Sequence, residues 1–291
     1  MSRRTNPYWP ILFLLLCVGT TPAAPEVHRT ADGLVATGDS GEPLWSRTFD
    51  YRLFRPLVVD DLVFVTGISG RLLALDRRTG RERWRFQTED DWLYPPVQAG
   101  GRLVVVGRDS GLHGLSPTDG REIWRRPLVQ EPTEGPAVAG GRVLQGTFGG
   151  VLWAISPKKG KVLWRRRLDS PPLRLVADDE LAVMGGYDTW LRAVQVGDGE
   201  LRWRLRLPGP LESPPLLDDG RVVVLVGTSL LAIDRRSGRL IQRLPASATG
   251  ERLRFLPETG KNSRLRWVSE ETEDGASQLQ RDAPDLPQQE E

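Results

Sequence analysis

The strongest constraint on this 291-residue chain is a tryptophan that returns every 39 or 40 residues. Each copy follows the pattern Gly-x-x-x-Trp, and a small residue keeps the same phase six positions before the glycine. The repeat residues are Trp45, Gly80, Trp84, Gly120, Trp124, Gly160, Trp164, Gly199, Trp203 and Gly238, with Gln242 in the tryptophan position of the last copy. A period of this length indicates a repeat protein, in which each unit buries its faces only against its neighbours.

Each period divides into four short runs of β-forming residues. In the first complete period, Pro56–Val59, Leu62–Thr66 and Leu72–Leu75 precede the run that contains Trp84. Pairs of Asp or Gly separate the first two runs of most copies, and both residue types tolerate the positive φ of tight hairpins. Four strands in about 40 residues form the blade of a β-propeller. We therefore predict an all-β propeller in which the tryptophans pack each blade against the next.

The number of blades follows from the two ends of the repeat region. Five periods are complete, and the chain before them holds two further strand-like runs, Leu34–Thr37 and Pro43–Arg47. The chain after them holds two runs in which apolar residues alternate with Arg, residues 252–255 and 264–267. Together these runs predict a sixth blade shared by both termini, which would leave no exposed sheet edge. Seven blades are the alternative, if the C-terminal runs form more than half a blade.

The repeats resemble the quinoprotein-type (PQQ-like) propeller repeat, whose pattern is Ala-x-Asp-x-x-Thr-Gly-x-x-x-Trp. Ala74, Asp76, Thr79, Gly80 and Trp84 match every position of it. The resemblance covers roughly residues 33–245 and implies the fold, whereas the same repeat serves both enzymes and binding scaffolds. In repeat type and export, the chain is similar to the propeller lipoprotein of the outer-membrane β-barrel assembly machinery, an eight-bladed family.

The N-terminus has the features of a secretory signal peptide. Arg3 and Arg4 precede the apolar run Ile11–Val18, which is too short to span a bilayer, and small residues follow it. We expect a signal peptide over residues 1–24, cleavage after Ala23 or Ala24, and an exported, periplasmic protein. Lipidation of Cys17 is the alternative, and it would make the chain an outer-membrane lipoprotein in contact with the membrane.

The rest of the chain divides by composition. A short linker is expected at residues 25–32, the propeller at 33–268 and a disordered acidic tail at 269–291, because the tail is rich in Glu and Asp and poor in large apolar residues. Without the two ends the core is basic, but its bases are spread along the strands. Nucleic acid is therefore not expected as a partner.

No catalytic, cofactor-binding or metal-binding residues emerge from the sequence. Its two His residues are isolated, and neither a P-loop nor a Gly-x-Ser-x-Gly motif is present. Quinoproteins of similar repeat type hold Ca²⁺ with acidic and amide side chains beneath a vicinal disulfide. After signal-peptide cleavage this chain has no Cys, and its only Asn is Asn262. A quinone-dependent oxidoreductase or quinone-binding sensor is therefore the second hypothesis.

The first hypothesis is a non-catalytic scaffold that binds protein partners in the cell envelope, with a role in outer-membrane protein assembly. In a propeller, the loops between blades share a face with the loops that join the second and third strands of each blade. Aromatic and acidic residues in such loops are typical of a protein-binding surface. The candidate partner-binding residues are Glu89, Asp90, Asp91, Trp92, Tyr94, Phe148 and Tyr187. We further expect the two faces of the propeller to differ in charge.

Overall fold

A computed structural model describes residues 24–89, 92–218, 220–245, 253–256 and 266–269. Outside these ranges lie residues 1–23 of the expected signal peptide, which include Cys17, and residues 270–291 of the expected acidic tail. Asp90 and Asp91 also lie outside them. Within them every regular element is a β-strand, and no helix is long and apolar enough to cross a bilayer.

Five sheets of four antiparallel strands follow one another along the chain, and they are numbered here as blades 1 to 5. Blade 1 contains β4 (Leu57–Val59), β5 (Leu62–Thr66), β6 (Arg71–Asp76) and β7 (Glu82–Gln87). Blade 2 contains β8 (Val97–Ala99), β9 (Arg102–Val106), β10 (Gly111–Leu115) and β11 (Glu122–Pro127). Blade 3 contains β12 (Ala137–Ala139), β13 (Arg142–Thr147), β14 (Val151–Ile155) and β15 (Val162–Arg167).

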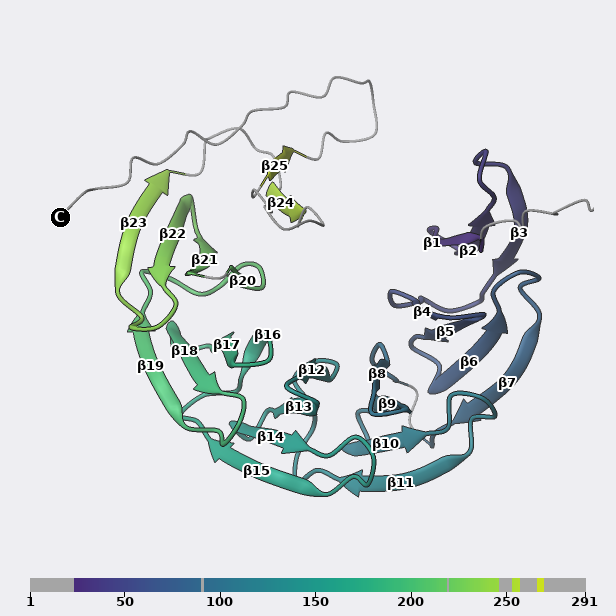
Figure 1. The fold of residues 1–291 in the computed structure, drawn as a ribbon, viewed down its shortest axis with the longest axis horizontal. Helices are drawn as coiled ribbons and strands as arrows, with labels where there is room; N and C mark the ends of the chain where they lie inside the picture. Colours follow the sequence, from purple (N-terminus) through teal and green to yellow (C-terminus); the bar gives the residue numbers. More distant parts are fainter. Residues whose placement is uncertain (1–23, 90–91, 219, 246–252, 257–265, 270–291) are drawn as a thin grey trace, which may run out of the picture.

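The last two complete blades have the same strand order. Blade 4 contains β16 (Leu173–Ala177), β17 (Leu181–Gly185), β18 (Trp190–Gln195) and β19 (Leu201–Arg206). Blade 5 contains β20 (Leu216–Leu217), β21 (Arg221–Val226), β22 (Ser229–Asp234) and β23 (Leu240–Pro245). In Figure 1 the short first strand of each blade lies toward the inside of an arc, and the fourth strand, which carries the repeat tryptophan in blades 1 to 4, forms its outer edge. The predicted all-β propeller with about six blades is confirmed.

The ends of the repeat region differ in detail from the expected closing blade. Before blade 1, β1 (Glu26–Arg29), β2 (Gly33–Thr37) and β3 (Pro43–Thr48) form a three-stranded N-terminal sheet. After blade 5, β24 (Leu253–Leu256) and β25 (Arg266–Ser269) pair with each other as a separate two-stranded sheet. Among the described residues no ladder joins these two sheets, and Figure 1 shows the arc open between blade 5 and the N-terminal sheet.

The expected linker at 25–32 therefore contains a strand. β1 pairs with β2 along its whole length, and it escaped prediction because Glu26–Arg29 has one apolar residue, Val27, among polar ones. Its backbone hydrogen bonds, rather than buried side chains, place it in the sheet.

Each hydrophobic core lies between two consecutive sheets. In blade 1, Val63 and Val65 pack toward the N-terminal sheet, whereas Phe64, between them in β5, packs toward blade 2. Because successive side chains of a strand point to opposite faces, a strand buried on both faces reads as a continuous apolar run. This is why the second and third strands of the blades show little polar alternation.

The repeated tryptophans connect each blade to the following one. The Trp124 ring of blade 2 lies so close over Gly160 of blade 3 that a Cβ on this glycine would meet the ring at 2.5 Å. The same ring donates a hydrogen bond from Nε1 to the carbonyl oxygen of Pro157, at 2.8 Å. Four further tryptophans repeat both contacts on the glycine and carbonyl of the next sheet: Trp45, Trp84, Trp164 and Trp203.

The aspartate of the repeat holds the turn that carries this glycine. Asp76 Oδ1 accepts hydrogen bonds from the backbone N–H groups of Arg78 and Thr79 and from Thr79 Oγ1. Its other oxygen forms an ion pair with Arg83 at 2.6 Å. The hydrogen bonds from Arg83 lower the pKa of Asp76 from 3.8 to about 2. Gly80 then adopts a φ of +67°, where a side chain is disfavoured.

We predict that Gly160→Ala destabilises the protein more than Gly141→Ala. Both glycines have positive φ, +63° and +68°, but a Cβ at Gly141 would meet no atom within 4 Å. Gly141→Ala should therefore cost only the backbone strain, about 1 kcal/mol. Gly160→Ala must also displace the Trp124 ring, which adds roughly 1–3 kcal/mol. Urea unfolding measures both, and equal losses would contradict the role given to the Trp124 contact.

We also predict that the stabilisation from Asp76 disappears in acid. Its pKa is lowered in the folded protein, so its contribution is complete above the ordinary value of 3.8 and is lost as the pH falls through about 2. Asp76→Asn should thus lower Tm at neutral pH, and the difference should vanish near pH 2. Arg83→Gln should move the loss to higher pH, whereas Arg78→Gln, a matched control, should not. A pH-independent Tm difference for Asp76→Asn would contradict this.

A candidate protein-interaction face

The loops between blades and the turns between second and third strands lie together, as the propeller hypothesis required. In blades 1, 2 and 3 a residue of the preceding inter-blade loop forms an isolated β-bridge with the end of the second strand: Leu53 with Gly67, Leu93 with Gly107, and Pro132 with Thr147. In blades 4 and 5 a side chain of the loop makes the link, from Ser170 to the backbone of Tyr187 and from Glu212 to that of Gly227. This loop-bearing surface is called the loop face below.

An aromatic cluster forms where blades 1 and 2 meet on the loop face. Trp92 packs against Phe54 and Tyr94, with ring centroids 5.4 and 6.1 Å away. Phe54 and Tyr94 stack with an angle of 9° between their planes. The guanidinium of Arg108 lies 5.8 Å from the centre of a Trp92 ring, within range of a cation–π contact. Phe54, which occupies the position of Tyr94 in the preceding repeat, was not among the residues predicted from the sequence.

Trp92 and Tyr94 are half-buried rather than fully exposed. Tyr94 packs against the core between blades 2 and 3, and its hydroxyl donates to the carbonyl oxygen of Pro132 at 3.5 Å. Trp92 Nε1 is buried and has no hydrogen-bond partner among the described residues. The two residues therefore contribute to the fold, and a partner would contact only part of each ring.

The other candidate residues of the described chain are more open. The side chains of Phe148 and Tyr187 are 44% and 69% exposed, and Glu89 is also exposed. The backbone N–H of Phe148 donates to the carbonyl of Glu131, whose carboxylate pairs with Arg108 at 3.6 Å. Phe148 and Tyr187 come from blades 3 and 4, so the accessible aromatics extend from the cluster over the neighbouring blades.

The bases of the chain gather on its outer edge, not on the face opposite the loops. The six outermost strands, β3, β7, β11, β15, β19 and β23, contain twelve Arg residues and two acids, Glu82 and Glu122. The opposite face mixes signs, with Asp178, Asp179 and Glu180 in one turn and Lys158, Lys159 and Lys161 in another. The bases are thus concentrated on the outer edge, and the expected difference in charge between the two faces stays a prediction.

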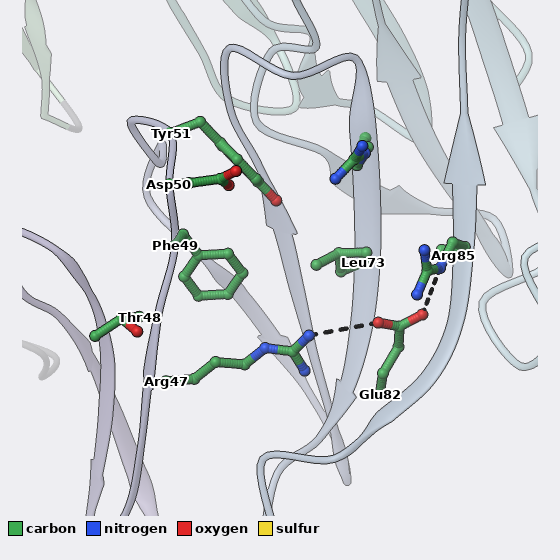
Figure 2. Close-up of a pocket in the computed structure, with 9 residues that line it drawn as sticks. Arg47, Thr48, Phe49, Asp50, Tyr51, Leu73, Glu82 and Arg85 are labelled. Carbon is green, nitrogen blue, oxygen red and sulfur yellow. Dashed lines mark hydrogen bonds and ion pairs between the residues drawn. The ribbon is translucent and has the colours of Figure 1, made fainter.

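Grooves open between consecutive sheets along the outer edge. The one between the N-terminal sheet and blade 1 has a volume of about 520 Å³ (Figure 2). In it Glu82 lies between Arg47 and Arg85, at 3.4 and 2.6 Å, while Phe49 and Leu73 form apolar walls. Glu82 pairs with both guanidinium groups, and a third arginine of the groove, Arg71, donates a hydrogen bond to Gln87, so its arginines have partners within the chain.

Ionisable side chains of the described residues serve turns and such ion pairs. His113 is buried, with Nδ1 2.6 Å from Glu122 and its ring against Phe86. Buried Arg192 binds Asp188, whose pKa it lowers by hydrogen bonding. In the described part of the chain no three His, Cys, Asp or Glu side chains are grouped as metal ligands. The His113–Glu122 and Arg192–Asp188 contacts each join residues of a single blade.

Comparison with known families points to one group of proteins. The family model described as outer membrane protein assembly factor BamB matches residues 31–174 and again residues 172–285. A curated relative with the same description, from Burkholderia pseudomallei (strain K96243), is 31% identical over 84 residues. That alignment covers 28% of this chain and 22% of the relative, so it spans about a fifth of the relative's length.

Solved structures share the fold at low sequence identity. BamB from Moraxella catarrhalis matches with a TM-score of 0.63 and 18% identity, over 86% of this chain and 85% of that one. The computationally designed Ika8 protein gives 0.66 at 14% identity, over 84% and 79% of the two chains. Sqt1 from Saccharomyces cerevisiae gives 0.70 at 11% identity, over 84% and 78%. At these identities the matches show the fold and assign no activity to the chain.

Proposed function

Because the chain belongs to the outer membrane protein assembly factor BamB family, we propose that it is a non-catalytic, exported scaffold that binds protein partners during outer-membrane protein assembly. The observation that carries the proposal is the loop face. Its loops are tied to the blades by repeated backbone bonds, so accessible aromatics from several blades have defined positions. A rigid surface loses little conformational entropy when a partner binds.

The proposed contact surface consists of Phe148 and Tyr187, together with the accessible part of the cluster around Trp92. Aromatic side chains bury a large area with few rotatable bonds, and they are enriched among residues that dominate binding energy. The exposed carboxylate of Glu89 on the same face favours a partner segment with basic residues. The acids at 90 and 91, outside the described residues, remain part of this proposal.

We predict that Phe148→Ala with Tyr187→Ala reduces recovery of envelope partners by about tenfold or more, as expected for hot-spot aromatics. Both side chains are exposed, so Tm should change by only a degree or two. The measurement is a quantitative pull-down from envelope extract. Leu163→Ala is the matched control, because Leu163 is similarly exposed, at 47%, but lies on the outer edge of blade 3.

Trp92→Ala with Tyr94→Ala should also weaken recovery, but it should lower Tm because Tyr94 packs against the core. Unchanged recovery in both double variants, per folded molecule, would contradict the loop-face proposal.

The quinone hypothesis is tested by a separate measurement. Stoichiometric binding of the quinone with Ca²⁺, accompanied by dye reduction, would replace the scaffold proposal by an oxidoreductase.

Export gives a separate prediction. The intact mass of the protein isolated from the envelope should correspond to a chain that begins after Ala23 or Ala24. A chain that begins at Cys17 with added lipid mass would support the lipoprotein alternative instead. A full-length chain that still carries Met1 in the soluble cell fraction would contradict export. Replacing Arg3 and Arg4 by Asn should reduce processing, since the positive region directs insertion of signal peptides.

A further inference from the structure

A second groove of the outer edge lacks an acid at the place where Glu82 lies in the groove of Figure 2. It lies between the loop after β11 and strands β14 and β15, has a volume of about 400 Å³, and is called the blade 3 groove. Val129, Val151 and the ring of Trp153 form its apolar walls, and Arg165 and Arg167 lie at its side. It corresponds to the groove in Figure 2, two repeats further along the chain.

The arginines at the equivalent position of the other blades can be compared with Arg165 of this groove. The arginine after the repeat tryptophan has a carboxylate partner in three other blades: Arg85 with Glu82 at 2.6 Å, Arg125 with Asp109 at 2.9 Å and Arg204 with Asp169 at 3.8 Å. The equivalent residue of blade 3, Arg165, has no such partner among the described residues, and neither does Arg167. The guanidinium of Arg165 instead lies 5.9 Å from the ring centre of Trp153.

The missing partners follow from three substitutions within the repeat. Val129 occupies the position of Asp50, Glu89 and Asp169 in other inter-blade loops. Gly149 occupies the position of Asp109 and Asp188, and Val162 that of Glu82 and Glu122. All three acidic positions are therefore neutral around this groove, while the arginine is retained. Blade 5 lacks the same three acids, but its Arg243 donates a hydrogen bond to Ser229 Oγ at 3.0 Å.

A buried donor in the wall is also unsatisfied. Trp153 is only 6% exposed, and its Nε1 has no acceptor among the described residues. The three residues that occupy the Trp153 position in blades 1, 2 and 4 are satisfied in other ways: Leu73 is apolar, His113 binds Glu122 and Arg192 binds Asp188. Two guanidinium groups without an internal carboxylate beside apolar walls match a carboxylate carried next to an apolar group.

We propose that the blade 3 groove binds an acidic residue and its apolar neighbour from an extended segment of a protein partner. This rests on the proposed scaffold function but uses a different surface from the loop face. The partner's carboxylate takes the place that Glu82, Asp109 or Asp169 has in the other grooves, and it accepts hydrogen bonds from Arg165 and Arg167. The adjacent apolar side chain packs on Trp153, Val151 and Val129.

The test uses the full chain and a peptide with blocked ends, Gly-Phe-Asp-Leu-Asp-Gly, measured by calorimetry. The indole N–H signal of Trp153, assigned with Trp153→Phe, reports occupancy by NMR. We expect binding that weakens at least tenfold when both Asp are Asn or when Phe and Leu are Ser. Arg165→Gln should weaken it at least tenfold, whereas Arg125→Gln, whose arginine already has an internal partner, should have no effect.

A matched pair of variants tests the missing acid directly. Val129 is 80% exposed, so substitution there leaves the core untouched. Val129→Asp restores the acid found in the other loops and should reduce peptide affinity at least tenfold. Val129→Asn, of the same shape without the charge, should remain within threefold of the parent. Equal affinities for these two variants, or equal affinity for the Asp and Asn peptides, would overturn the proposal.

Measurements on the same protein samples distinguish failure of the groove proposal from failure of the proposed scaffold function. Loss of partner recovery only in loop-face variants, with no peptide binding to the parent protein, overturns the groove proposal and leaves the scaffold function standing. Peptide binding together with unchanged recovery in the loop-face variants supports the groove and removes the loop face. Binding to phosphatidylglycerol vesicles that Arg165→Gln abolishes, without peptide binding, would assign the groove to lipid and overturn the protein partner.

Discussion

The contact between a tryptophan of one blade and a glycine of the next is the interaction on which the rest of this structure depends. The ring covers a position where a Cβ would collide, and Nε1 reaches a carbonyl three residues before that glycine. The glycine also needs its positive φ to close the turn between the last two strands. One residue type thus meets two demands, and the same contact at five junctions sets how each sheet lies on its neighbour.

The contact is absent at both ends of the described arc. Gly41 of the N-terminal sheet has the positive φ of the other repeat glycines, but no atom lies within 4 Å of its Cβ position. At the other end, Gln242 of blade 5 replaces the tryptophan, and no described repeat blade follows it. Among the described residues, a tryptophan at position 242 would have no glycine of a following blade to cover.

The repeat made most of the fold predictable. Strand positions, turn residues and the pairing of one tryptophan with the next blade all follow from a pattern with a period near 40. β1 did not follow, because its single Val27 gives no alternation to read. The partners of Trp92 did not follow either. Phe54 comes from the preceding repeat, and only the curvature of the arc brings it within 5.4 Å of Trp92.

Which arginines of the outer edge have a carboxylate partner becomes clear only when equivalent positions of the repeats are compared. The number of Arg residues in the outer strands indicates a basic edge. In three blades, however, the arginine that follows the repeat tryptophan pairs with an acid from a nearby loop, turn or strand. These acids, Glu82, Asp109 and Asp169, occupy three different positions of the repeat. Their joint absence around Arg165 leaves a guanidinium beside apolar walls with no internal anion among the described residues, whereas in blade 5, which lacks the same acids, Arg243 donates hydrogen bonds to Ser229 Oγ. The guanidinium of Arg165 is hydrated by water, so a ligand carboxylate can form a charge-assisted hydrogen bond with it. In the other blades such a bond is already made by an acid of the chain itself.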